Sequence, residues 1–237
     1  MTSALHLAPS CRSVAGLSER FADPARLEPL KWLAVLAMIC DHLALTVLPQ
    51  HQWLRAIGTF AYPVFVMSFG VGLASSRDPL RAARALVLPY VVAQAAWLLI
   101  SPSAPWNVLL VCIYAAMAIA VWRYLQPQRF AWVALLVPFA LLAADLHGYE
   151  GGVLGFAMLA GAFLFALGSP WLLLASSLLW FVLLPSSGFL LGVFAVVFLP
   201  RLPFTVPRVR GLLAWVYAGH LAVLAALMRF GGVNGLV

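Results

Sequence analysis

Long apolar runs follow one another from about residue 30 to residue 229, with only short polar breaks between them. A helix that crosses the hydrocarbon core of a bilayer needs about 20 predominantly apolar residues, and most of these runs approach that length. We therefore expect an all-α integral membrane protein with about nine transmembrane helices. The expected spans are 30–49, 55–75, 85–101, 106–122, 130–146, 151–168, 170–185, 188–200 and 211–229.

The stretch 151–200 is divided only by Gly168-Ser169-Pro170 and by Pro185-Ser186-Ser187-Gly188. Both breaks are typical of helix ends, although proline also occurs as a kink inside membrane helices. The run 188–200 is short for a full crossing, so a tilted or re-entrant helix is an alternative. Pairs of glycines four residues apart, at 151/155 and 188/192, favour close helix packing.

The composition excludes a soluble globular fold. The chain has 237 residues, of which 65% are hydrophobic and 9% are charged, whereas a soluble domain has about 25% charged residues. We expect a polar cytoplasmic segment over 1–29 without a cleavable signal peptide, a membrane domain over 30–229 and a short tail over 230–237. Cys11, Cys40 and Cys112 form no disulfide or metal-binding pattern.

The net charge of +7 comes almost entirely from arginine, and the basic residues lie between the apolar runs. They do not form a basic soluble face, so a nucleic-acid partner is not expected. With the N-terminus inside, twelve of the fourteen Lys and Arg residues fall on the inner side, and only Arg55 and Arg229 fall outside. This bias predicts a cytoplasmic N-terminus in a bacterial inner membrane, with lipids as partners.

Three ionisable residues occur near the middle of predicted spans: Asp41 and His42 in the first and His220 in the last. A charged residue at the bilayer centre costs about 2.5–3.5 kcal/mol on insertion scales, so each is a candidate site residue. Neighbours in a helix point about 100° apart, so Asp41 is poorly placed to orient His42. Pairing of Asp41 with Arg55 or His220 from another helix is more plausible, and the set predicts proton transfer.

The alternative is structural: Asp41 and Arg55 form a buried ion pair, and His42 and His220 donate hydrogen bonds between helices. Asp145, His147 and Glu150 lie at the outer end of the fifth span and in the short loop after it, and they fit an ordinary polar loop. On the inner side, the arginines at 77, 81 and 84 could clamp a phosphate, because guanidinium groups bind phosphate with paired donors. Anchoring to lipid headgroups is the simpler explanation.

Several of these segments resemble the TraX family of conjugative pilin N-acetyltransferases. The resemblance covers about residues 30–225 and includes the segments Leu30–Ala34, Met38–His42, Leu54–Gly58, Phe60–Phe65, 77–84, Asn107–Leu109, Ala144–Asp145 with Gly148, Gly152–Leu154 and Tyr217–Leu221. Thr59, the 145–149 segment and Ala218 depart from the family pattern, which indicates a divergent member.

The resemblance implies an inner-membrane acyltransferase that moves acetyl from acetyl-CoA to the N-terminal amine of a pilin subunit. His42 or His220 would then be the base, Asp41 or Arg55 would support the base or the oxyanion, and the three arginines would hold the CoA phosphates. No metal is implied. Two alternatives are a proton-coupled transporter and a non-catalytic pilin assembly factor, and haem binding by the histidines is a weaker third.

Overall fold

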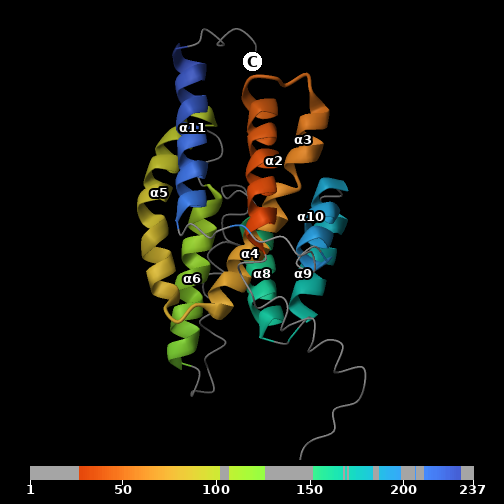
Figure 1. The fold of residues 1–237 in the computed structure, drawn as a ribbon, viewed down its shortest axis with the longest axis vertical. Coiled ribbons are helices and arrows are strands. Elements are labelled where there is room, and N and C mark those ends of the chain that lie inside the picture. The colour runs from red at the N-terminus through yellow and green to blue at the C-terminus, as the bar shows by residue number, and fades with distance from the viewer. Residues whose placement is uncertain are drawn as a thin grey trace, which may run out of the picture.

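A computed structural model describes residues 27–101, 107–125, 152–167, 169, 171–183, 187–198, 206 and 211–230. These residues form helices and contain no β-strand, which confirms the predicted all-helical fold (Figure 1). The helices are α2 (Glu28–Thr46), α3 (Gln52–Gly58), α4 (Ala61–Ser75), α5 (Pro79–Ile100), α6 (Val108–Leu125), α8 (Gly152–Ala166), α9 (Trp171–Leu183), α10 (Ser187–Phe198) and α11 (Leu212–Phe230).

Five segments of the described chain are long and apolar enough to cross a membrane: α2, α3 with α4, α5, α6 and α11. Helices α8, α9 and α10 have 15, 13 and 12 residues, which is shorter than a full crossing of about 20 residues. The membrane class is thus supported, whereas the total of nine spans stays a prediction. The expected span 130–146 lies outside the described residues.

One predicted helix boundary is wrong, for a local reason. Helix α5 begins at Pro79, six residues before the predicted 85, because the Asp78 side chain caps its first turn. The Asp78 carboxylate accepts a hydrogen bond from the backbone N–H of Arg81 at 3.0 Å, and proline suits the first helical turn. The span predicted over 55–75 is confirmed as one candidate crossing, Gln52–Ser75, although a turn at Thr59–Phe60 separates α3 from α4.

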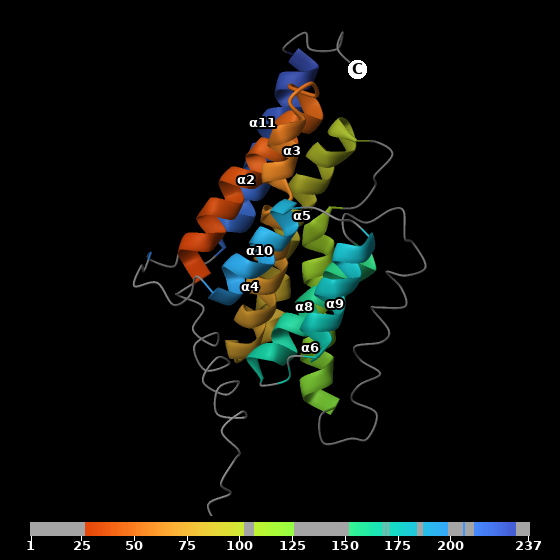
Figure 2. The same cartoon turned by 90° about the vertical axis from the view of Figure 1, so that its right-hand side faces the viewer.

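Helix α4 is central and contacts α2, α6, α8 and α10, whereas α11 packs against α5 and α2 (Figures 1 and 2). Glycines allow these close approaches. A Cβ atom on Gly70 would lie 2.3 Å from the carbonyl oxygen of Leu159 in α8. Gly188 and Gly192 face the backbone of Ala56 and Phe60 at comparable distances, which confirms the packing role predicted for this pair.

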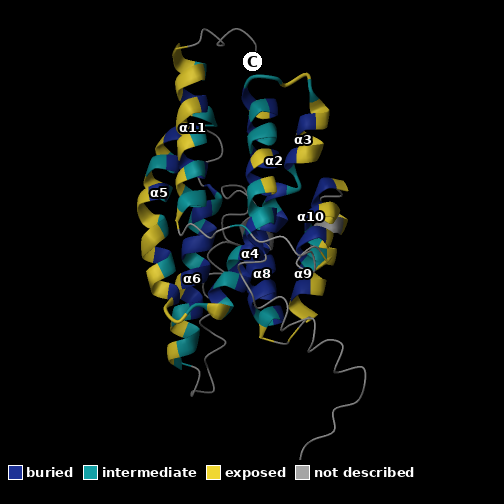
Figure 3. Cartoon of the chain, viewed as in Figure 1, coloured by how far each residue is buried: buried dark blue, intermediate teal, exposed yellow. Residues whose placement is uncertain are grey.

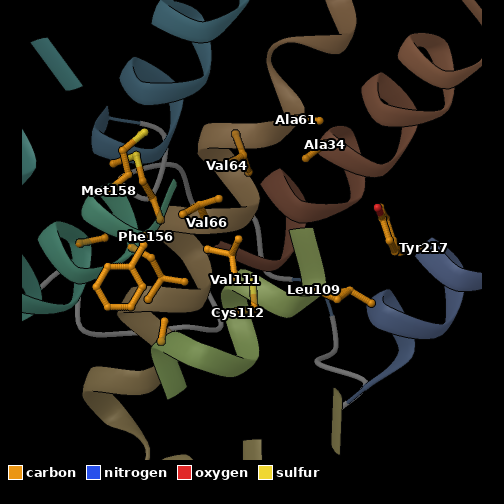
Figure 4. Close-up of a cluster of buried hydrophobic side chains, with 14 of the residues drawn as sticks. Ala34, Ala61, Val64, Val66, Leu109, Val111, Cys112, Phe156, Met158 and Tyr217 are labelled. Atoms are coloured by element: carbon orange, nitrogen blue, oxygen red, sulfur yellow. The ribbon is translucent and has the colours of Figure 1, made fainter. Parts of the chain in front are cut away.

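Large apolar side chains cover the outside of the bundle. Figure 3 shows exposed positions along the outer faces of α5, α9, α10 and α11, and Leu36, Leu88 and Val182 are each at least 60% exposed. A soluble monomer rarely exposes apolar patches of this extent. The buried core lies between α2, α4, α6, α8 and α11 and includes the residues drawn in Figure 4.

One end of the bundle collects most of the described basic residues, and we call it the basic end. Its members surround the turn between α4 and α5 and comprise Lys31, Arg77, Arg81, Arg84 and Arg123. Arg55 is in α3 and Arg229 is in the last turn of α11, beside the opposite end (Figure 1). This separation agrees with the predicted charge bias, and the orientation itself stays a prediction.

Arg123, in the last turn of α6, holds the C-terminus of α4. Its guanidinium donates hydrogen bonds to the carbonyl oxygens of Leu73 (2.9 Å), Ala74 (3.0 Å) and Ser76. The last carbonyls of a helix have no intrahelical partner, and a cation at this end also complements the helix dipole. Arg123 therefore connects α6 to the start of the α4–α5 turn.

We expect Arg123→Met to destabilise the detergent-purified protein by at least about 2 kcal/mol, because three carbonyls lose a charged donor at once. Arg84→Met is the control, since Arg84 is exposed and makes a single 3.4 Å contact with Asp78. Reversible thermal or denaturant unfolding measures both variants. Equal stability of Arg123→Met and the wild type would contradict the anchoring role.

Candidate functional site

The first and last described helices bring His42 and His220 into direct contact. His42 Nδ1 lies 2.5 Å from His220 Nε2. The two rings are within 4° of parallel and their centroids are 4.8 Å apart, so the nitrogens are much closer than the ring centres. The rings therefore meet edge to edge through a hydrogen bond.

The partners of the pair define which nitrogens carry hydrogen. His220 Nδ1 is 3.3 Å from the carbonyl oxygen of Val216, one turn earlier in α11. A carbonyl only accepts, so Nδ1 of His220 is the donor and its Nε2 accepts from His42 Nδ1. In this assignment the Nε2 atom of His42 keeps its lone pair, which is the requirement for a general base.

His42 is held in place on several sides. Its side chain is 2% exposed, and its backbone carbonyl accepts a hydrogen bond from the Thr46 hydroxyl at 2.7 Å. The ring centroids of Trp97 and Tyr217 lie 5.7 and 6.3 Å from that of His42. Tyr217 also contacts His220 edge-on, at 5.5 Å. An aromatic shell from α5 and α11 thus surrounds the histidine pair.

Asp41 pairs with Arg55 and not with either histidine. Asp41 Oδ1 lies 3.6 Å from Arg55 Nε, and the two side chains are 19% and 44% exposed. This pairing is one of the two partners that the sequence suggested for Asp41. Gly58, one turn after Arg55 in α3, lies directly against Asp41, because a Cβ atom there would be 2.2 Å from Asp41 Cβ. Glycine is therefore required for α3 to approach α2.

A cavity of about 870 Å³ opens between α2, α4, α5, α6 and α11. Its charged lining residues are Glu28, Lys31, Arg77, Asp78 and Arg81, all at the basic end. Glu28 and Lys31 form an ion pair of 2.5 Å. The uncharged lining residues further along each helix include Phe65, Ser68, Leu86, Leu109, Cys112 and Tyr217.

The lining therefore changes from charged to apolar along the cavity. Arg81 begins the lining on α5, and Leu86 lies about 7 Å further along that helix. Beside α11 the lining begins at Gly211, the residue before the helix, and it ends at Tyr217, about 9 Å further along. Figure 4 shows Tyr217 directed toward α2, with Leu109 and Cys112 of α6 nearby. The cavity thus extends from the arginines of the basic end to Tyr217, which contacts both histidine rings, whereas His42, His220 and Trp97 are not among its lining residues.

The predicted arginine cluster is divided by the fold. Arg77 and Arg81 line the cavity, whereas Arg84 is outside its lining and contacts the Asp78 carboxylate at 3.4 Å. Asp145, His147 and Glu150, which the sequence suggested as polar loop residues, lie outside the described residues. Among the residues that the structure describes, no group of three or more His, Cys, Asp and Glu side chains is arranged to hold a metal ion.

Sequence reasoning gave no role to Trp97, Tyr217 or Ser68. Tyr217 precedes His220 by three residues, and this spacing places both on one face of α11. The sequence alone therefore indicated that Tyr217 lies beside His220. Trp97 and Ser68 belong to other helices, so only the packing of α4 and α5 against α2 shows their relation to the site.

The fold and the site define a helical membrane protein with a hydrogen-bonded histidine pair, of which His42 is buried, and a cavity that opens at its basic end. The model of the TraX family, described as TraX protein, matches residues 26–228. The match covers most of the chain, and the chain belongs to the TraX family. No curated protein and no solved structure matches it.

We expect Gly58→Ala to destabilise the protein, because the new methyl group collides with Asp41 and must separate α3 from α2. Gly219→Ala is the matched control: it is also a helical glycine, and a Cβ atom there meets no atom within 4 Å. The control should be neutral or stabilising by up to about 1 kcal/mol, from helix propensity alone. Thermal unfolding in detergent compares the two, and equal midpoints would contradict the close contact.

Proposed function

We propose that this protein is an inner-membrane acetyltransferase that moves acetyl from acetyl-CoA to the N-terminal amine of a pilin subunit. Membership of the TraX family supports a role in the processing of conjugative pilin. The observation that carries the proposal is the cavity, because it joins a pair of arginines to the residue that packs against both histidines. A phosphate-bearing donor with an uncharged reactive arm suits this distribution of charge.

In the proposed complex, Arg77 and Arg81 bind the donor phosphates at the basic end. Guanidinium groups form charged, paired hydrogen bonds with phosphate oxygens, and Lys31 is already compensated by Glu28. The apolar walls accept the uncharged arm, and the thioester lies at the Tyr217 end of the cavity. Under the predicted orientation, the basic end faces the cytoplasm, where acetyl-CoA is available.

The acceptor amine approaches from the other side of His42 in this proposal. The Asp41–Arg55 pair and α3 lie toward the end opposite the basic end (Figure 1). Under the predicted orientation this is the periplasmic side, where a processed pilin presents its N-terminus. Asp41 and Arg55 hold α3 beside the path of the acceptor and support the base or the oxyanion.

The chemistry needs one proton acceptor. The neutral amine attacks the thioester carbonyl carbon, a C–N bond forms, and the carbonyl π electrons move to oxygen. His42 Nε2 takes a proton from the amine nitrogen, the C–S bond breaks, and the proton passes to the departing thiolate. His220 is a positioning residue, because its Nε2 accepts the Nδ1–H hydrogen bond of His42 and fixes the tautomer.

A proton-coupled transporter is the second candidate, favoured by the hydrogen-bonded histidine pair inside the bundle. The two functions differ in their products. Reconstituted liposomes would show proton-linked solute flux for a transporter, and acetyl-CoA would have no effect on it. Consumption of acetyl-CoA that depends on pilin supports the acetyltransferase.

The intact mass of pilin tests the proposal most directly. We expect a mass larger by about 42 Da, the increment of one N-terminal acetyl group, in cells with the wild-type gene and not in the deletion strain. His42→Ala should abolish the increment, and Trp122→Phe, a change in α6, is the control for protein level. Identical pilin masses in the wild-type and deletion strains would disprove pilin acetylation.

The division of the arginine cluster gives a second test. Arg81→Ala should raise the KM for acetyl-CoA about tenfold, the loss of one charged phosphate contact. Arg84→Ala should raise it less than about twofold, because Arg84 lies outside the cavity lining and contacts Asp78. Steady-state kinetics with purified protein measure both variants. Equal effects would place the phosphates elsewhere on the basic end.

A further inference from the structure

The indole N–H of Trp97 is a buried donor that has no acceptor among the residues described by the structure. Trp97 is 6% exposed, and its Nε1 atom makes no hydrogen bond with any residue that the structure describes. Buried polar groups in proteins are nearly always hydrogen-bonded, so such a donor calls for a physical explanation. Phenylalanine would fill much of the same space without bringing a polar group into the core.

Four other buried polar atoms of the described residues have no hydrogen-bond partner, and they are Asp41 Oδ1, His51 Nδ1 and the hydroxyl oxygens of Ser68 and Ser177. Asp41 Oδ1 faces the charged Arg55 side chain at 3.6 Å, and His51 precedes α3, where an imidazole nitrogen without hydrogen is only an acceptor. A serine hydroxyl in a helix can rotate to bond the carbonyl four residues earlier. The indole N–H is fixed in the plane of a large ring and has no such local acceptor. Trp97 therefore needs an acceptor from outside its own helix.

The position of Trp97 indicates where that acceptor would lie. Its ring centroid is 5.7 Å from that of His42, with the planes inclined by 47°. Helix α5 also carries Arg81 and Leu86, which line the cavity. Leu86, Ala93 and Trp97 are separated by seven and four residues, so they share one face of α5. One helix thus extends from the cavity mouth to the ring beside His42.

We propose that the Trp97 N–H donates a hydrogen bond to the carbonyl oxygen of the thioester during transfer; this inference rests on the proposed function. When the amine attacks the carbonyl carbon, negative charge develops on that oxygen, and it returns to a carbonyl when the C–S bond breaks. A donor aimed at the developing charge stabilises the transition state more than the bound substrate. Trp97 would then be a catalytic residue and not only a packing residue.

Trp97→Phe tests this role, because it keeps an aromatic ring and removes the N–H. We expect kcat to fall about 100-fold, in the range seen when one oxyanion donor is removed, while the KM for acetyl-CoA changes less than about twofold. The pH dependence of kcat should keep its midpoint. Thermal stability should change little, because the loss of an unpaired donor and the cavity left by the smaller ring act in opposite directions. Trp122→Phe is the matched control and should retain wild-type kcat.

Wild-type kcat in Trp97→Phe would overturn the inference. A displaced pH midpoint would also overturn it, because the N–H would then act on His42 and not on the substrate. If Trp97→Phe fails to fold, benzothienylalanine at position 97 keeps the bicyclic shape with sulfur in place of N–H, and the same kinetic criteria apply. Failure of the proposed function itself is distinct, since the wild-type protein would then transfer no acetyl to pilin.

Discussion

The hydrogen bond between His42 and His220 is the interaction on which the architecture of the site depends. It joins α2 and α11 through two residues that are 178 positions apart in the sequence. An unpaired imidazole N–H inside an apolar bundle would carry a desolvation cost, so each ring needs the other. The pairing places α11 against α2 as well as α5, and this arrangement closes one wall of the cavity.

The size of the residues between the helices explains why the cavity lies on the side of α4 that faces α5, α6 and α11. On its other side, α4 packs closely against α8 and α10, because Gly70, Gly188 and Gly192 permit backbone contact. Toward α5, α6 and α11, the lining of the cavity includes the large side chains of Phe65, Phe69 and Leu86. Glycines thus permit tight helix packing on one side of α4, whereas large side chains line the cavity on the other side.

Much of the helix arrangement could be predicted from the long apolar runs. A segment inside a membrane must form hydrogen bonds with all of its own backbone N–H and C=O groups, and a helix does this. Helix geometry disfavoured pairing of Asp41 with His42 and left Arg55 and His220 as candidates, and the structure pairs Asp41 with Arg55. The edge-to-edge histidine bond and the position of Trp97 could not be predicted, because they depend on packing between distant helices. The division of Arg81 from Arg84 required knowing that Asp78 caps α5 and contacts Arg84.

The distribution of charge limits the chemistry that this site can perform. Formal charges gather at the basic end and in the Asp41–Arg55 pair, whereas the shell around His42 consists of His220, Trp97 and Tyr217. Burying these neutral groups costs far less than burying an isolated carboxylate or ammonium. A reaction at His42 therefore relies on neutral donors and acceptors that are already oriented. Such a centre suits transfer of an uncharged acyl group to a neutral amine, because neither reactant carries its charge into the middle of the bundle.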